Sequence, residues 1–239
     1  MVDVSPPTAA IAIAGRPFPF PYHGRLEPPA TALLVIDLQV DFLSPEGYFA
    51  RKGYDPTPLR SILPAVNRVI AAARRAGCLI VYTRQGYRAD GADLTPYRRW
   101  RRGRAGLEGT AIMCRGNPGF ELVPELTVLP EDVVVDKTAN GSFTYTDLEA
   151  VLRAKGIEYL LFSGCTTDVC VHSTLREACD RHFQCLLIED ACASGDPYAH
   201  RAAVHMVTVE DGIFGVVSDS AAVVAGLLAQ AAASRVGPG

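Results

Sequence analysis

Short runs of consecutive apolar residues alternate along the chain with segments in which apolar residues recur every three or four positions. The runs are rich in Val, Ile and Leu and predict buried strands, at residues 32–37, 79–83, 133–136, 159–163, 185–189 and 214–217. The intervening segments predict helices, at residues 59–76, 146–155, 168–181 and 199–209, and an Ala-rich helix from Ser220. This alternation predicts an α/β fold of three α/β/α layers around a six-stranded, mostly parallel sheet.

Two regions fall outside this pattern. Residues 1–30 are rich in proline and have no regular period, which predicts an extended arm that lies on the domain or on a neighbouring subunit. Residues 85–130 form a long irregular excursion rich in Gly and Arg, where a binding loop is expected. Residues 31–239 are therefore expected to form one domain.

Composition narrows the class of protein. The 239 residues are 49% hydrophobic with a net charge of −3, which is typical of a globular domain. The cysteine count of seven is odd, and several cysteines lie in apolar runs, so reduced thiols of a cytoplasmic protein are expected rather than a disulfide framework. No apolar run approaches the ~20 residues of a membrane helix, and no signal peptide pattern is present. We expect no membrane contact.

One dense group of basic residues has two interpretations. It surrounds Trp100 and consists of Arg98, Arg99, Arg101, Arg102 and Arg104. Such a group can bind phosphate or nucleic acid, or it can form a solvated or inter-subunit loop. The acidic overall balance favours the second interpretation, so no nucleic-acid partner is expected.

Three reactive residues follow predicted strands. Asp37 ends the first strand, Lys137 follows the third and Cys170 lies just beyond the fourth. Each alone has an ordinary explanation: a turn carboxylate, a solvated cation and a small core side chain. Because the carboxyl ends of parallel strands meet at one edge of a sheet, the three together predict an active site.

The segment around Cys170 reads Ser-Gly-Cys-Thr-Thr-Asp-Val-Cys. Gly164 permits an unusual backbone after the strand, and Thr167 or Asp168 can cap the next helix. Cys170 then falls in the first helical turn, where the free N–H groups and the helix dipole favour a thiolate. The same N–H groups can receive an oxyanion.

Three segments resemble the isochorismatase-like cysteine hydrolases, over nearly the whole chain. They are residues 34–42, residues 135–143 and the segment that ends at Cys170. The resemblance implies a six-stranded parallel sheet and assembly as a homodimer or homotetramer. It also implies a non-proline cis peptide before Thr166, with the backbone N–H groups of Thr166 and Cys170 as the oxyanion hole.

The resemblance and the residues together predict a mechanism. Asp37 takes the proton from Cys170, while Lys137 holds both groups and stabilises their charge. The thiolate attacks a carbonyl and forms a thioester, which water cleaves, and ammonia is released. No metal and no organic cofactor is expected.

Within the family, residues 17–24 and 205–215 are similar to biuret hydrolases and to the ureidoacrylate hydrolases near them. A small ureide or linear amide, biuret-like, is therefore the expected substrate. Candidates for the pocket wall are Phe42, Asn140, Phe143 and Glu210, although core packing explains the two phenylalanines equally well. Asn140 and Glu210 depart from the biuret pattern, in which Lys and Gln are expected. Glu210 is expected to disfavour a distal carboxylate, such as that of ureidoacrylate, and to favour triuret.

Several alternatives stay open. Triuret, ureidoacrylate and N-carbamoyl compounds are other substrates, and streptothricin-type lactam hydrolases share the cysteine set. Nicotinamidases carry a metal site with two His after the catalytic Asp, whereas residues 38–60 contain no His, so no metal is expected. Isochorismatases proper lack the nucleophilic cysteine. A relative that binds without catalysis is the alternative from a different class.

Overall fold

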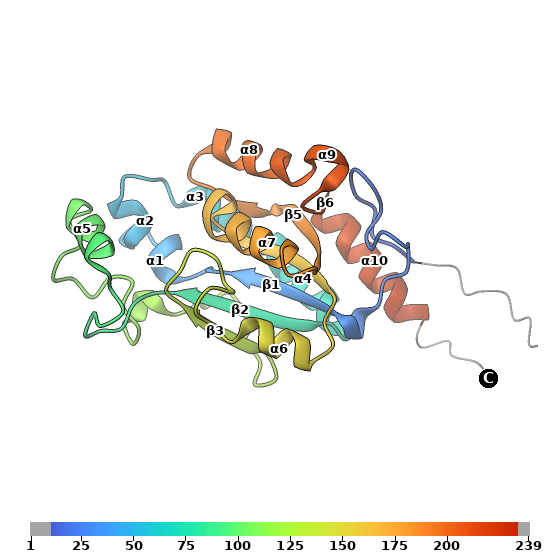
Figure 1. Ribbon diagram of the computed structural model, residues 1–239, viewed down its shortest axis with the longest axis horizontal. Helices are drawn as coiled ribbons and strands as arrows, with labels where there is room; N and C mark the ends of the chain where they lie inside the picture. Colours follow the sequence, from blue (N-terminus) through green and yellow to red (C-terminus); the bar gives the residue numbers. More distant parts are fainter. Residues whose placement is uncertain (1–10, 234–239) are drawn as a thin grey trace, which may run out of the picture.

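Six parallel strands form the centre of the molecule (Figure 1), a computed structural model that describes residues 11–233. The strands are β1 (Thr31–Ile36), β2 (Leu79–Gln85), β3 (Val133–Lys137), β4 (Tyr159–Cys165), β5 (Gln184–Ala193) and β6 (Val216–Ser218). Their order is β3-β2-β1-β4-β5-β6, and each neighbouring pair is parallel. The predicted six-stranded sheet is confirmed, with every pairing parallel.

Helices cover both faces of the sheet. Figure 1 shows one layer in front, made of α6 (Leu148–Ala154), α7 (His172–Cys179) and α8 (Pro197–Val207). The other layer is made of α4 (Leu63–Ala76) and α10 (Ser220–Ala233). The other α-helices of residues 11–233 are α1 (Val40–Leu43), α2 (Tyr48–Arg51), α3 (Thr57–Ser61), α5 (Pro96–Arg104) and α9 (Val209–Gly212). A separate apolar core lies under each layer, which confirms the three-layer prediction.

Two elements differ from their predicted bounds for local reasons. The helix expected over residues 59–76 is divided into α3 and α4, because Pro64 has no N–H to continue the hydrogen-bond ladder. Helix α4 ends as expected before Gly77, which takes the left-handed conformation at φ 89°. Strand β5 continues beyond its apolar run, through Glu189 and Asp190, which interrupt the hydrophobic pattern.

The predicted arm lies on this chain's own domain from residue 11 onward. Ile13, Phe20 and Leu26 are buried in the core, and Ile13 pairs with Phe20 in an antiparallel bridge. Arg16 pairs with Val217 of β6, so the arm covers an edge strand of the sheet. Residues 1–10 of the arm lie outside the described residues, as do residues 234–239 of the predicted domain, and the boundary at residue 31 stays a prediction.

The strand order reverses between β1 and β4, which are direct neighbours at the centre of the sheet. Ligand sites in open α/β sheets lie at the carboxyl ends of the strands where the order reverses. Asp37 follows β1 and Cys170 follows β4, so both flank this point. Helix α5 lies at the end of the molecule to which the carboxyl ends of β1 and β4 point, and α9 and β6 lie at the other end (Figure 1).

Candidate active site

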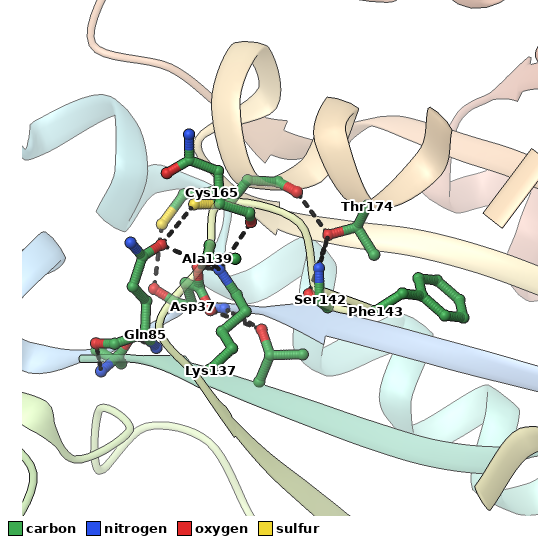
Figure 2. A network of polar contacts seen from close by, with 12 residues as sticks. Asp37, Gln85, Lys137, Ala139, Ser142, Phe143, Cys165 and Thr174 are labelled. Atoms are coloured by element: carbon green, nitrogen blue, oxygen red, sulfur yellow. Dashed lines mark hydrogen bonds and ion pairs between the residues drawn. The ribbon is translucent and has the colours of Figure 1, made fainter. Parts of the chain in front are cut away.

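Asp37, Lys137 and Cys170 form one buried cluster at the carboxyl edge of the sheet. The side chains of Asp37 and Lys137 are fully buried, and Nζ of Lys137 lies 2.7 Å from Oδ2 of Asp37. The Cys170 thiol joins this pair through Gln85, whose Oε1 accepts hydrogen bonds from both Nζ of Lys137 and Sγ of Cys170. Figure 2 shows Asp37, Gln85 and Lys137 pointing toward one another from three neighbouring strand ends. The structure thus brings together the three residues that the sequence singles out.

The surroundings of Lys137 keep its amine charged. Nζ donates hydrogen bonds to Oε1 of Gln85 at 3.0 Å and to the carbonyl oxygens of Ala139 and Asn140 at 3.1 and 2.9 Å. Burial by itself lowers the pKa of Lys137, but Asp37 and Cys170 beside it outweigh burial and raise the pKa above its ordinary value. Lys137 is therefore a fixed positive charge next to the thiol.

The two carboxylate oxygens of Asp37 differ in their hydrogen bonding. Its Oδ1 accepts a hydrogen bond from Oγ1 of Thr83 at 2.6 Å, which fixes the plane of the carboxylate. Its Oδ2 meets Lys137 as an ion pair and has no further hydrogen-bond donor among residues 11–233. Oδ2 can therefore receive a proton from a neighbouring group.

Burial favours the neutral form of the Cys170 thiol. Burial raises the pKa of Cys170 to about 12; Lys137 opposes this shift and Asp37 adds to it. The expected cap by Thr167 or Asp168, with Cys170 in the first turn of the following helix, is wrong, because α7 begins only at His172. Cys170 lies in a π-helical turn, Thr167–Val171, which has no side-chain cap, and the Thr167 hydroxyl pairs with Nδ1 of His200 instead. The thiol thus needs a base to become a nucleophile.

The backbone before Cys170 has the form that the family resemblance implies. The peptide bond between Cys165 and Thr166 is cis. Gly164 has φ 114°, and a Cβ atom there would lie 2.1 Å from the carbonyl oxygen of Ile36. Only glycine allows β4 to approach β1 this closely, so the unusual backbone expected at Gly164 is confirmed.

Gln85 is a functional candidate that the sequence reasoning missed. It is the last residue of β2, between the strands that precede Asp37 and end in Lys137. Its Oε1 accepts hydrogen bonds from both Nζ of Lys137 and Sγ of Cys170. The strand-end rule that selects the other residues applies equally to Gln85, but an uncharged amide gave no chemical signal.

A pocket of about 570 Å³ opens onto Cys170. Its wall combines aromatic rings with basic groups: Phe42, Tyr48, Phe49, Tyr54, Tyr87, Lys52, Arg98, Arg101 and Arg102. Phe42 and Asn140, two of the predicted wall residues, line it, and so do Thr166 and Cys170. The acidic residues of the lining are Asp168 and Asp196, so positive charge is in excess.

Phe143 does not line this pocket, and the prediction that it does is wrong. Its ring belongs to the core under α7, with its centroid 5.8 Å from that of Phe183 and 5.0 Å from the Arg181 guanidinium carbon. Figure 2 shows the ring pointing away from Asp37 and Lys137. The core-packing interpretation of Phe143 therefore applies.

Glu210 lies at the edge of the sheet formed by the amino ends of the strands, whereas the pocket lies at the carboxyl ends. Its predicted place in the pocket of its own chain is therefore also wrong. Helix α8 starts at the carboxyl end of β5 and returns to the amino edge, where α9 carries Glu210 into β6. Glu210 is exposed there, in a left-handed turn at φ 50°. Its carboxylate therefore cannot repel a substrate bound at Cys170 of the same chain.

Replacement of Glu210 by glutamine is expected to leave the relative kcat/KM values for biuret, triuret and ureidoacrylate unchanged within twofold. The physical reason is distance, because the two edges of the sheet are separated by the length of a strand. Steady-state measurement of ammonia release with the three substrates checks this result. A changed ratio would contradict the placement of Glu210 outside the site.

The basic group around Trp100 is a helix and not a solvated loop. Helix α5 begins after Thr95, whose side chain accepts a hydrogen bond from the Arg98 N–H at 3.3 Å. It buries none of its residues, but it presents Arg98, Arg101 and Arg102 to the pocket. The excursion expected to carry a binding loop thus does contribute to the pocket wall.

Comparison with known proteins decides the family. Residues 31–222 match the family described as Isochorismatase domain. The chain belongs to the isochorismatase family. This family member is 33% identical over 224 residues to the ureidoacrylate amidohydrolase RutB of Methylobacterium radiotolerans. The alignment covers 89% of this chain and 83% of the relative. RutB of Caulobacter vibrioides is also 33% identical, with 88% and 90% covered.

Solved structures of the family share the fold. A cysteine hydrolase of Pseudomonas syringae superposes with a TM-score of 0.73 at 26% identity, which covers 86% of this chain and 95% of that one. N-carbamoylsarcosine amidase of Thermoplasma acidophilum superposes with a TM-score of 0.62 at 26% identity, with 80% and 96% covered. The predicted class, a hydrolase of non-peptide C–N bonds, is confirmed by the amidohydrolase relatives.

Within residues 11–233, no group of three His, Cys, Asp or Glu side chains is arranged to hold a metal ion. No helix in the same range has the length and apolar character that crossing a bilayer requires.

Proposed function

We propose that this protein is a cysteine-dependent amidohydrolase that cleaves a C–N bond in the carbamoyl group of a small ureido acid. The observation that carries the proposal is the buried Lys137–Asp37 ion pair, whose lysine shares the Gln85 oxygen with the Cys170 thiol at the end of a pocket. A thiol, a base and a fixed cation gathered in one cluster are the groups that nucleophilic acyl transfer needs.

The burial of the cluster defines the order of proton transfers. Because the thiol is protonated at rest, Asp37 must take its proton as the substrate carbonyl arrives. The charge of Lys137 stabilises the thiolate that forms. Sulfur then bonds to the carbonyl carbon, the C–N bond to the substituted nitrogen breaks, and Asp37 returns the proton to that nitrogen as the amine departs. A water activated by Asp37 cleaves the remaining S-carbamoyl thioester to carbamate, which decomposes to CO2 and ammonia.

The oxyanion of this reaction is assigned to the backbone N–H groups of Thr166 and Cys170. Both residues line the pocket beside the sulfur, at the turn that follows β4. Two amide donors fixed by the backbone stabilise a developing oxyanion without reorganisation. The groups required for the reaction are all supplied by the chain itself.

The basic wall of the pocket favours a substrate with a carboxylate. Arg102 is engaged with the carbonyl oxygens of Leu107, Thr110 and Ile112, and Arg98 donates to the Tyr87 hydroxyl. The guanidinium of Arg101 has no hydrogen bond or ion pair with another residue in the range 11–233. Its guanidinium is therefore available for a carboxylate, which it can bind through paired hydrogen bonds.

The names of the relatives agree with this choice. They are ureidoacrylate amidohydrolases and, among solved structures, an N-carbamoylsarcosine amidase. Both named substrates combine a carbamoyl group with a carboxylate. Biuret and triuret have carbamoyl groups but no carboxylate. We therefore place ureido acids ahead of the biuret-like substrate that the sequence favours. Assembly as a homodimer or homotetramer and a cytoplasmic location stay predictions.

Replacement of Arg101 by glutamine is expected to raise KM for ureidoacrylate about tenfold, the ratio for loss of one charge-assisted hydrogen bond. The value of kcat should change less than threefold, because Arg101 binds the distal end of the substrate. Ammonia release at varied concentrations of ureidoacrylate and N-carbamoyl amino acids measures both constants.

Arg104 provides the matched control on the same helix. Its guanidinium carbon lies 5.4 Å from the centroid of the exposed Trp100 ring, and it does not line the pocket. Arg104→Gln should therefore leave KM unchanged. The proposed substrate class is wrong if the parent protein hydrolyses biuret faster than every ureido acid tested, or if the Arg101 and Arg104 variants behave alike.

A further inference from the structure

The carboxamide oxygen of Gln85 connects two of the three reactive groups. It accepts a hydrogen bond from Nζ of Lys137 at 3.0 Å and one from Sγ of Cys170 at 3.1 Å. Gln85 is itself buried, with 6% of its surface exposed, and it borders the pocket. The thiol therefore shares one neutral acceptor with the ammonium, which also pairs with Asp37.

Lys137 determines which way the amide of Gln85 faces. An ammonium group has three donors and no acceptor, so the oxygen and not the nitrogen of the amide must point toward it. The amide nitrogen is left on the other side and makes no hydrogen bond with any residue of the described range. The thiol hydrogen is thus directed at an oxygen whose orientation a buried charge fixes.

The backbone of Gln85 is held as firmly as its side chain. Oε1 of Gln39 accepts a hydrogen bond from the Gln85 N–H at 2.7 Å, and Nε2 of Gln39 donates to the Gln85 carbonyl at 3.1 Å. The same Nε2 donates to the Phe120 carbonyl, and Gln39 is fully buried. These bonds leave the Gln85 side chain little freedom to move away from Cys170.

We propose that Gln85 is a positioning residue that holds the Cys170 thiol and the Lys137 ammonium in the geometry for reaction. The proposal rests on the proposed function of Cys170 as the nucleophile. A neutral acceptor suits this place, because a second carboxylate would leave two negative charges against one lysine and would oppose formation of the thiolate. Gln85 acts through Cys170 and Lys137 and forms no bond to the substrate carbon.

Two variants separate the hydrogen bonds of Gln85 from its bulk. Gln85→Met keeps the length of the side chain and removes the oxygen acceptor, whereas Gln85→Glu keeps an oxygen and adds a negative charge. In Gln85→Met, kcat for ureidoacrylate should fall at least tenfold with KM within threefold, because the nucleophile is misplaced while the pocket wall is intact.

The reactivity of the thiol toward iodoacetamide gives a readout that needs no substrate. At pH 9, alkylation of Cys170 should be at least threefold faster in Gln85→Met, because the hydrogen bond that stabilises the neutral thiol is lost. It should be about tenfold slower in Gln85→Glu, because added negative charge reduces the fraction of thiolate. Tandem mass spectrometry assigns the alkylated position. Faster alkylation combined with slower turnover is a pattern that a merely structural role does not produce.

Gln184, at the amino end of β5 and outside the pocket, provides the control. Gln184→Met should match the parent in every measurement. A kcat of Gln85→Met within twofold of the parent, or alkylation rates of both Gln85 variants within twofold of it, overturns the proposal. If the parent hydrolyses no ureido acid, the proposed substrate class fails, and the alkylation rates alone decide the role of Gln85.

Discussion

Replacement of Cys170 by serine is expected to lower ammonia release from ureidoacrylate at least ~10³-fold. The structure explains the size of the effect. Burial already raises the pKa of the thiol to about 12, and a hydroxyl in the same place is a much weaker acid. A carboxylate such as Asp37 is too weak a base to activate it. Stopped assays of ammonia with concentrated enzyme measure the residual rate.

The serine variant should keep its fold, because the replacement is nearly isosteric and the hydroxyl can still donate to Gln85. The thermal unfolding midpoint, followed by circular dichroism, checks this point. Cys179 is the matched control: it lies on α7, and its Sγ donates to the Ile213 carbonyl, away from the pocket. Cys179→Ser should retain activity. Activity of Cys170→Ser within tenfold of the parent would exclude Cys170 as the nucleophile.

Replacement of Asp37 by asparagine is expected to lower kcat at least ~10²-fold, the lower scale for loss of a positioned general base. It should also destabilise the protein by ~3–5 kcal/mol, because Lys137 is then a fully buried cation without its counter-charge. Steady-state kinetics measure the first effect, and urea unfolding measures the second. Normal kinetics in Asp37→Asn would contradict the role of Asp37 as the base.

A double variant distinguishes the two effects of this substitution. When Asp37→Asn is combined with Lys137→Met, the cluster no longer contains an uncompensated charge. Most of the lost stability should return, while activity should stay at the level of the single variant or below it. Recovery of activity together with stability would show that Asp37 and Lys137 serve the fold and not the reaction.

The placement of the reactive residues was predictable from the linear pattern alone. Apolar runs report strands buried on both faces, and parallel strands bring their carboxyl ends to one edge. Asp37, Lys137 and Cys170 each follow such a run, so their meeting needs no knowledge of side-chain packing. The same rule would have included Gln85, had an uncharged amide been considered among the reactive groups.

The pattern was less informative wherever an element buries no apolar face. Helix α5 consists of Pro96–Arg104 and buries no residue, so it has no apolar period for the sequence to reveal. Its N-cap at Thr95 and its place beside the pocket became visible only in the structure. The side on which Glu210 lies was likewise decided by topology, because α8 returns to the amino edge before α9 begins.

The sequence by itself determined the fold, the edge of the sheet where the buried cluster lies, and the choice of Cys170, Asp37 and Lys137 as candidates for nucleophile, base and cation. Only the tertiary structure decided their electrostatic state. The protonation of Cys170 and the charge of Lys137 depend on complete removal of water and on contacts between β1, β2, β3 and the turn after β4. Such desolvation results from residues far apart in the chain, so a local pattern of helix caps cannot reveal that burial opposes the thiolate.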